Sequence, residues 1–193
     1  MAYSDFTLAE IKKRFNLKID ESHNLFAQVG EVEITQFLSE FEAEIPATRK
    51  CLERVPEKLY DWKPHEKSMT LGYLTLLVAE IPMWIAVMIK TREIDFQTFK
   101  HFQAKTTNEM VNHFDENVNS ARQAFQELTS NDLSKPFVLK NGDYIIISSP
   151  LVENISSTLN HWVHHRGQLT VYMRLNDIQV PSIYGPSADE KNF

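Results

Sequence analysis

The chain is poor in cysteine and glycine. Cys51 is the single cysteine in 193 residues, so no disulfide can form within the chain, and we expect it to be a half-buried structural residue. Only five glycines occur, and none stands in the GxxxxGK or GxGxxG patterns that wrap backbone amides around a phosphate. Nucleotide chemistry built on such loops is therefore not expected.

The chain also lacks an excess of positive charge. Its 20 lysines and arginines stand against 26 aspartates and glutamates, which gives a net charge of −6. Nucleic acid and anionic membrane surfaces are therefore not expected as partners. The first ten residues, MAYSDFTLAE, do not show the basic and then apolar order of a secretory signal, so we expect a cytoplasmic protein.

One long apolar run is present, from Leu71 to Ile89. Glu80 and Pro82 lie near its middle, where a membrane span would tolerate a carboxylate poorly, and the chain has no second run of this kind. We interpret the run as the most buried helix of a soluble helical bundle.

Apolar periodicity predicts four helices and one hairpin. Apolar residues recur at spacings of three and four over residues 32–54, 70–92, 106–128 and 151–175. Asn141-Gly142, between β-branched and aromatic runs, predicts a small hairpin over 137–147, in the long connection between the third and fourth helices. We therefore predict an N-terminal extension over 1–30, a bundle over 31–178, and a tail over 179–193 that packs on the bundle.

Histidines cluster in the fourth predicted helix, in the run NHWVHHRGQ. His161 and His165 are i and i+4, so their rings lie about 40° apart on one helix face. Two neutral imidazoles on one turn can hold a divalent metal, although this spacing also occurs in purely structural helices. A metal site would need a third ligand from another helix, which spacing cannot reveal.

Longer motifs resemble a known family. The runs HHRGQLTVYMRLNDIQVPSIYGPSADE, DWKPHEKSMTLGYL and AEIPMW resemble the DinB-like proteins, the DinB/YfiT superfamily of metal-dependent hydrolases, over roughly residues 32–190. The resemblance implies an all-α four-helix bundle with up-down-down-up connectivity, which is usually a homodimer. It also implies zinc or nickel on three histidines, two of which match His161 and His165. Some relatives transfer low-molecular-weight thiols to electrophiles.

The third family histidine is missing here. It belongs to the second helix, and Leu77 stands at its position. Leucine cannot bind a metal, so we expect a degenerate site whose divalent metal, zinc or nickel, is weakly bound or absent. Glu80, near the same face, is a candidate third ligand. The pocket is expected to include Leu77, Trp84, Arg166 and Gln168, although Arg166 could instead pair with a neighbouring helix and Trp84 could be a core anchor.

Two hypotheses follow from these motifs. The favoured one is a dimeric, non-catalytic or small-ligand-binding bundle with a degenerate metal site. The alternative is a metal-dependent hydrolase or thiol transferase that uses His161, His165 and a substitute third ligand. The metal content of protein purified without chelator or nickel resin discriminates between them.

Overall fold

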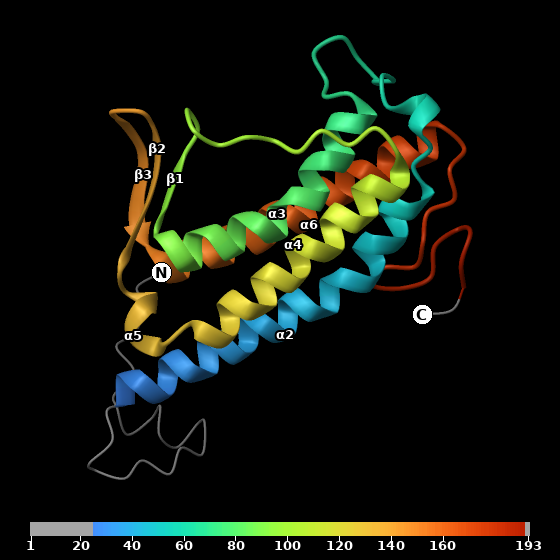
Figure 1. Cartoon of the computed structure of the whole chain (residues 1–193). Coiled ribbons are helices and arrows are strands. Elements are labelled where there is room, and N and C mark those ends of the chain that lie inside the picture. The colour runs from blue at the N-terminus through green and yellow to red at the C-terminus, as the bar shows by residue number, and fades with distance from the viewer. Residues whose placement is uncertain (1–24, 192–193) are drawn as a thin grey trace, which may run out of the picture.

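Four long helices make up most of the computed structural model, which describes residues 25–191 (Figure 1). Most of the predicted extension over residues 1–30 lies outside the described part. The predicted helices are confirmed, but the first begins at Leu25 rather than at residue 32. The long helices are α2 (Leu25–Arg54), α3 (Leu71–Thr91), α4 (Thr107–Glu127) and α6 (Leu151–Leu175), with the shorter η1 (Glu57–Leu59) and α5 (Ser130–Leu133) between them.

The long helices pack side by side around one core. Helix α3 contacts α4 and α6 along its length, and α2 packs on α4 and α6. Helices α2 and α6 run in one direction, whereas α3 and α4 run in the other (Figure 1). Phe41 and Trp162 meet at the centre with ring centroids 5.4 Å apart, and both side chains are almost completely buried.

A proline fixes α6 against α3. Pro82 lies inside α3 and has no N–H, so the carbonyl of Val78, four residues earlier, loses its helical hydrogen bond. The indole of Trp162 donates to that carbonyl instead, over 2.9 Å. Because Trp162 follows His161 directly, this bond also sets the height of His161 along α3.

The small sheet stands at one end of the helices. Strand β1 (Glu93–Asp95) pairs in parallel with β2 (Pro136–Asn141), which pairs antiparallel with β3 (Tyr144–Pro150). The predicted hairpin is thus confirmed, with Gly142 at φ +61° in its turn. Strand β1 was not predicted, because three residues with one apolar side chain give no periodic signal. The chain is therefore mostly helical with a three-stranded sheet.

Burial accounts for the apolar composition of α3. Among the described residues it is the one helix that is long and apolar enough to cross a membrane. Most of its side chains are buried within the protein, including those of Leu74, Ile81 and Ile85. A core helix with neighbours on several sides needs this composition, as the sequence predicted.

The C-terminal segment returns along α2 and α6. The carboxylate of Glu190 pairs with Arg54, and Asp189 pairs with Arg174. Ile178, Val180 and Ile183 pack against the core. These contacts place Tyr184 beside the middle of α2.

Candidate functional site

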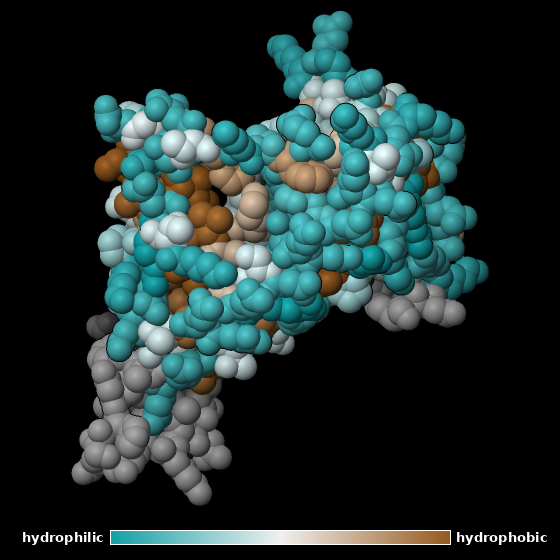
Figure 2. Space-filling view, in the orientation of Figure 1, coloured by the Kyte–Doolittle hydropathy of each residue, from teal (hydrophilic) through white to brown (hydrophobic). Residues whose placement is uncertain are grey.

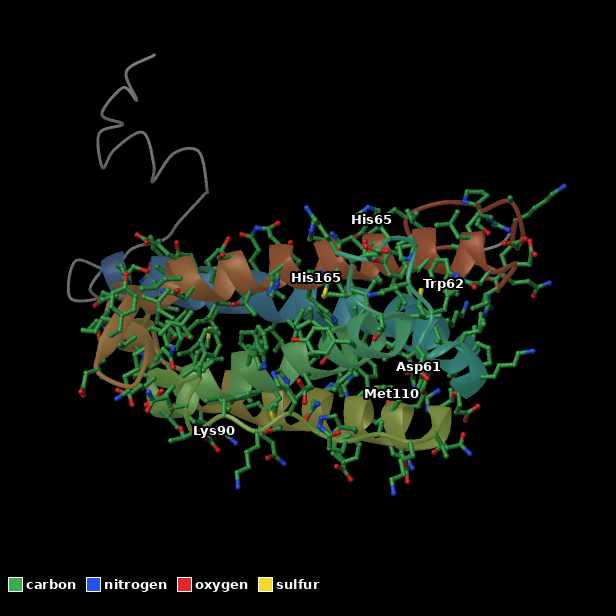
Figure 3. All side chains as sticks on the ribbon, turned by 90° about the horizontal axis from the view of Figure 1, so that it is seen from above. Asp61, Trp62, His65, Lys90, Met110 and His165 are labelled. Carbon is green, nitrogen blue, oxygen red and sulfur yellow. The ribbon has the colours of Figure 1, made fainter. Side chains whose placement is uncertain are left out.

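His161 and His165 face each other on α6. Their Nε2 atoms are 2.7 Å apart and their ring centroids 4.4 Å apart. The hydrogen bond of Trp162 to α3 fixes this stretch of α6. Figure 3 shows His165 in the middle of the molecule, whereas Lys90 lies near the end of α3. The structure therefore brings together the two histidines that the i, i+4 spacing predicted.

Gln168 orients the pair. An amide oxygen can only accept, so Nδ1 of His165 donates to Oε1 of Gln168 over 2.8 Å. The amide nitrogen of Gln168 donates in turn to Nε2 of His164, 3.0 Å away. Neutral His165 therefore keeps its lone pair on Nε2, and Nε2 of His161 donates to it. This leaves Nδ1 of His161 as a free acceptor.

Both imidazoles are neutral at pH 7. Burial lowers the pKa of His161 to about 4, helped by the neighbouring His165 and His164. Burial also lowers the pKa of His165, with His164 adding to the effect while the hydrogen bond to Gln168 opposes it. Neutral imidazole is the form that binds a metal or accepts a hydrogen bond.

The depressed pKa of His161 predicts a loss of stability in acid. The unfolded chain takes up this proton near pH 6.5 and the folded chain near pH 4, so the unfolded state binds more protons between these values. The contribution of neutral His161 to the free energy of unfolding is fully present above pH 6.5 and is lost as the pH drops toward 4. The loss is roughly 1–2 kcal/mol after allowance for solvent around the half-exposed ring. Urea unfolding of metal-free protein between pH 4 and 7 measures this loss, and His161→Asn should reduce it. An unchanged pH profile in the variant would contradict the assignment.

Among residues 25–191, the structure brings two histidines together as donors for a metal. The facing Nε2 atoms, and the hold of Gln168 on the other nitrogen of His165, are features of histidines that bind zinc. However, no group of three or more His, Cys, Asp or Glu side chains suited to a metal ion occurs among residues 25–191. Two imidazoles do not fit a tightly bound zinc or nickel ion, which takes at least three protein ligands.

Glu80 has other partners. Its carboxylate is fully buried and accepts hydrogen bonds from the amide of Phe102, at 2.8 Å, and from Nδ1 of His101, at 2.6 Å. Nε2 of His113 lies 3.8 Å away. These partners could not be predicted from the sequence, because His101 and Phe102 lie outside any periodic segment.

Leu77 lies on the same stripe of α3 as Trp84, whose ring contacts His161. It precedes Trp84 by two helical turns, and the Trp84 ring lies 5.7 Å from the His161 ring. Helices α3 and α6 run in opposite directions. Leu77, seven residues before Trp84 on α3, therefore lies at the level of residues that follow His165 on α6. Leu77 is buried in the core.

Arg166 lies in the helix interface. Its guanidinium pairs with Glu44 on α2 at 2.5 Å and donates to the hydroxyl of Tyr184 at 2.8 Å. The same guanidinium donates to the backbone carbonyl of Glu44 and to Thr48. This matches the second role that the sequence suggested, an ion pair with a neighbouring helix. Gln168 contacts His165 and His164, whereas Arg166 binds α2 and Leu77 is buried in the core. None of the three lines the pocket described next.

A pocket of about 320 Å³ lies between α3, the sheet and α6, and ends at His161. Figure 2 shows hydrophobic surface lining a hollow between the strands and α3. Most of the lining side chains are aromatic or aliphatic, and the polar ones come from one stripe of α6. The lining residues are Trp84, Met88, Ile94, Phe96, Phe99, Phe137, Leu139, Ile147, Asn154, Ser157, Thr158 and His161.

Sequence reasoning identified Trp84 and His161 but missed the rest of the pocket. A signal was present in the fourth helix, where Asn154, Ser157, Thr158 and His161 recur at spacings of three, four and seven. This spacing puts the four polar side chains on one helix face, which is also the pattern of a face turned to solvent. The apolar lining residues from the sheet and from the segment after β1 carry no such pattern.

Comparisons with known proteins give one family match and one curated relative. The sequence model of the DinB family matches residues 24–192. The uncharacterized protein YrdA of Bacillus subtilis (strain 168) is 23% identical over 158 residues, which cover 81% of this chain and 91% of that protein.

Two solved structures share the fold. A DinB-like protein from Bacillus cereus ATCC 10987 superposes with a TM-score of 0.60 at 22% identity, covering 77% of this chain and 95% of that one. The DinB-like protein YjoA from Bacillus subtilis gives a TM-score of 0.61 at 18% identity, with 82% and 99% covered.

Proposed function

Because this chain belongs to the DinB family, we propose that it is a small-molecule-binding member of the family with an incomplete metal site. The observation that carries the proposal is the pocket that ends at His161. Its volume lies in the range of small-molecule sites, which are mostly apolar with a few polar groups that fix orientation.

The lining selects an uncharged ligand. None of the twelve described residues that line the pocket carries a charge at pH 7, because His161 is neutral. A charged ligand would lose its hydration without gaining an ion pair, which is costly. His161 offers an acceptor nitrogen, and Ser157 and Thr158, which also line the pocket, carry hydroxyls. The ligand is therefore an uncharged molecule with an aromatic or branched body and one hydroxyl or amide group.

The family also supports the larger architecture. We propose that the four long helices form the up-down-down-up four-helix bundle of the family, and that the protein is a cytoplasmic homodimer. The opposite directions of the helix pairs α2 and α6, and α3 and α4, support the bundle (Figure 1). Light scattering at micromolar concentration tests the dimer, and a stable mass near 22 kDa would argue against it.

Fluorine NMR with simple aromatic probes tests the ligand class. We expect 4-fluorobenzyl alcohol to bind with a dissociation constant on the order of 0.1–1 mM, in keeping with its few heavy atoms. The anion 4-fluorobenzoate and the cation 4-fluorobenzylamine should bind at least tenfold more weakly, because the pocket offers them no counter-charge.

Two isoleucines of β3 provide a matched control. Ile147 lines the pocket, whereas Ile145, two residues away and also exposed, does not. Ile147→Trp should block binding of the alcohol and Ile145→Trp should leave it unchanged. Equal binding by both variants, or equal binding of the charged probes, would refute the proposed site.

A metal-dependent hydrolase or thiol transferase is the second candidate. The facing Nε2 atoms of His161 and His165, with Gln168 behind them, favour it. These two histidines would hold the ion, which would supply a water or thiol of lowered pKa. Stoichiometric zinc or nickel in protein purified without chelator or nickel resin would favour this candidate over the first.

A further inference from the structure

The segment between β1 and α4 forms a thin wall of the pocket. Phe96 and Phe99 of this segment line the pocket on its inner side. Phe99, with Ile94, also lines an open surface groove of about 580 Å³ on the outer side. One layer of side chains therefore separates the pocket from the groove.

Glu80 fastens the middle of this segment to α3. Hydrogen bonds at residues 97–99 lead back to Asp95 within the same stretch. By contrast, His101 and the amide of Phe102 bond to the buried Glu80 carboxylate. The Phe102 ring also stacks on the His113 ring of α4 at 4.1 Å.

The attachment of this segment to α3 involves a buried charge but only a few hydrogen bonds. Burial raises the pKa of the Glu80 carboxyl. The nearby His113 ring, 3.8 Å away, and the hydrogen bonds from His101 and the Phe102 amide outweigh this effect and hold the pKa below its ordinary value. The carboxylate is therefore ionised at pH 7, and it would be left buried without these partners if the segment moved away. Only a few bonds must break, so the segment can open locally while the helices stay folded.

We propose that residues 96–105 are a gate between the surface groove and the ligand pocket, and that Glu80 is the positioning residue that holds the gate closed. The ligand enters from the groove when Phe99 swings outward. The gate serves the pocket of the proposed function, on which this inference rests.

Hydrogen exchange of the free protein tests, without any ligand, whether Glu80 holds the gate closed. In Glu80→Gln, which keeps the shape but removes the charge, amides 99–104 should exchange at least tenfold faster than in the native protein, with α4 and α6 unchanged. Glu42→Gln, which removes a carboxylate paired with Arg122 elsewhere on the helices, should leave this segment unchanged. If Glu80→Gln does not fold, His101→Ala should show the same local acceleration. Unchanged exchange, or equal acceleration throughout the protein, would overturn the proposal.

Fluorine exchange spectroscopy with 4-fluorobenzyl alcohol tests the gate itself. Glu80→Gln and Phe99→Ala should each raise the association and dissociation rates at least fivefold, while the dissociation constant changes less than threefold in Glu80→Gln. Rates equal to those of the native protein would overturn the gate. If the alcohol does not bind the native protein, the proposed function fails. Hydrogen exchange alone then decides whether Glu80 holds residues 96–105 closed.

Discussion

Replacing Arg166 with methionine is expected to lower the free energy of unfolding by about 3–5 kcal/mol. The guanidinium is almost fully buried and is the charged partner of the Glu44 carboxylate. Without it, a buried carboxylate on α2 has no counter-charge, and the Tyr184 hydroxyl loses a donor. Urea unfolding of metal-free protein at pH 7 measures the loss.

Two further variants separate the charge from the shape. Glu44→Leu combined with Arg166→Met should be more stable than Arg166→Met alone, because the double variant buries no unpaired charge. Tyr184→Phe, which removes one hydroxyl, should cost only about 1 kcal/mol. A loss below about 1 kcal/mol in Arg166→Met would show that the pair does not hold α6 to α2.

Leu77→His is expected to tighten zinc binding at least a hundredfold. The native pair of imidazoles leaves the coordination shell incomplete, and Leu77 shares a stripe of α3 with Trp84, whose ring contacts His161. Without metal the new ring should cost roughly 1–3 kcal/mol, because it places a polar group in an apolar core. Zinc should restore that stability, since it binds only the folded state. Calorimetric titration and melting with and without zinc measure both effects.

Leu76→His is the matched control for this variant. Leu76 is 9% exposed and Leu77 is 8% exposed, but the two side chains point about 100° apart around α3. Leu76→His should therefore lose similar stability and gain no zinc affinity. Equal affinity in Leu77→His and the native protein would show that Leu77 does not face the histidines. Tight binding by the native protein would show that another residue completes the site.

Periodicity predicted the long helices well, because each buries one apolar stripe against its neighbours. The position of Pro82 inside the buried helix could also be read from the sequence. Its consequence could not, because the partner of the freed Val78 carbonyl is Trp162, 84 positions away in the chain. Strand β1 was not predicted, because its three residues are defined as a strand by their pairing with the distant β2.

The candidate site was predicted in part, for similar reasons. His161 and His165 are neighbours on one helix, so spacing alone brings them together. The partners of Glu80 come from an irregular segment that has no period to read. A neighbouring helix was expected as the partner of Arg166, but spacing could not identify Glu44. The aromatic wall of the pocket comes from strands and loops that fold against the ends of α3 and α6. Long-range packing places these residues.

Intermolecular nuclear Overhauser effects between 4-fluorobenzyl alcohol and the metal-free native protein show whether this pocket is the ligand site. We expect saturable binding, with contacts from the aromatic ring to Phe99 and Phe137 and from the hydroxymethyl group to His161. Binding without those contacts, or no saturable binding at millimolar concentration, would contradict the assignment of this pocket as the ligand site.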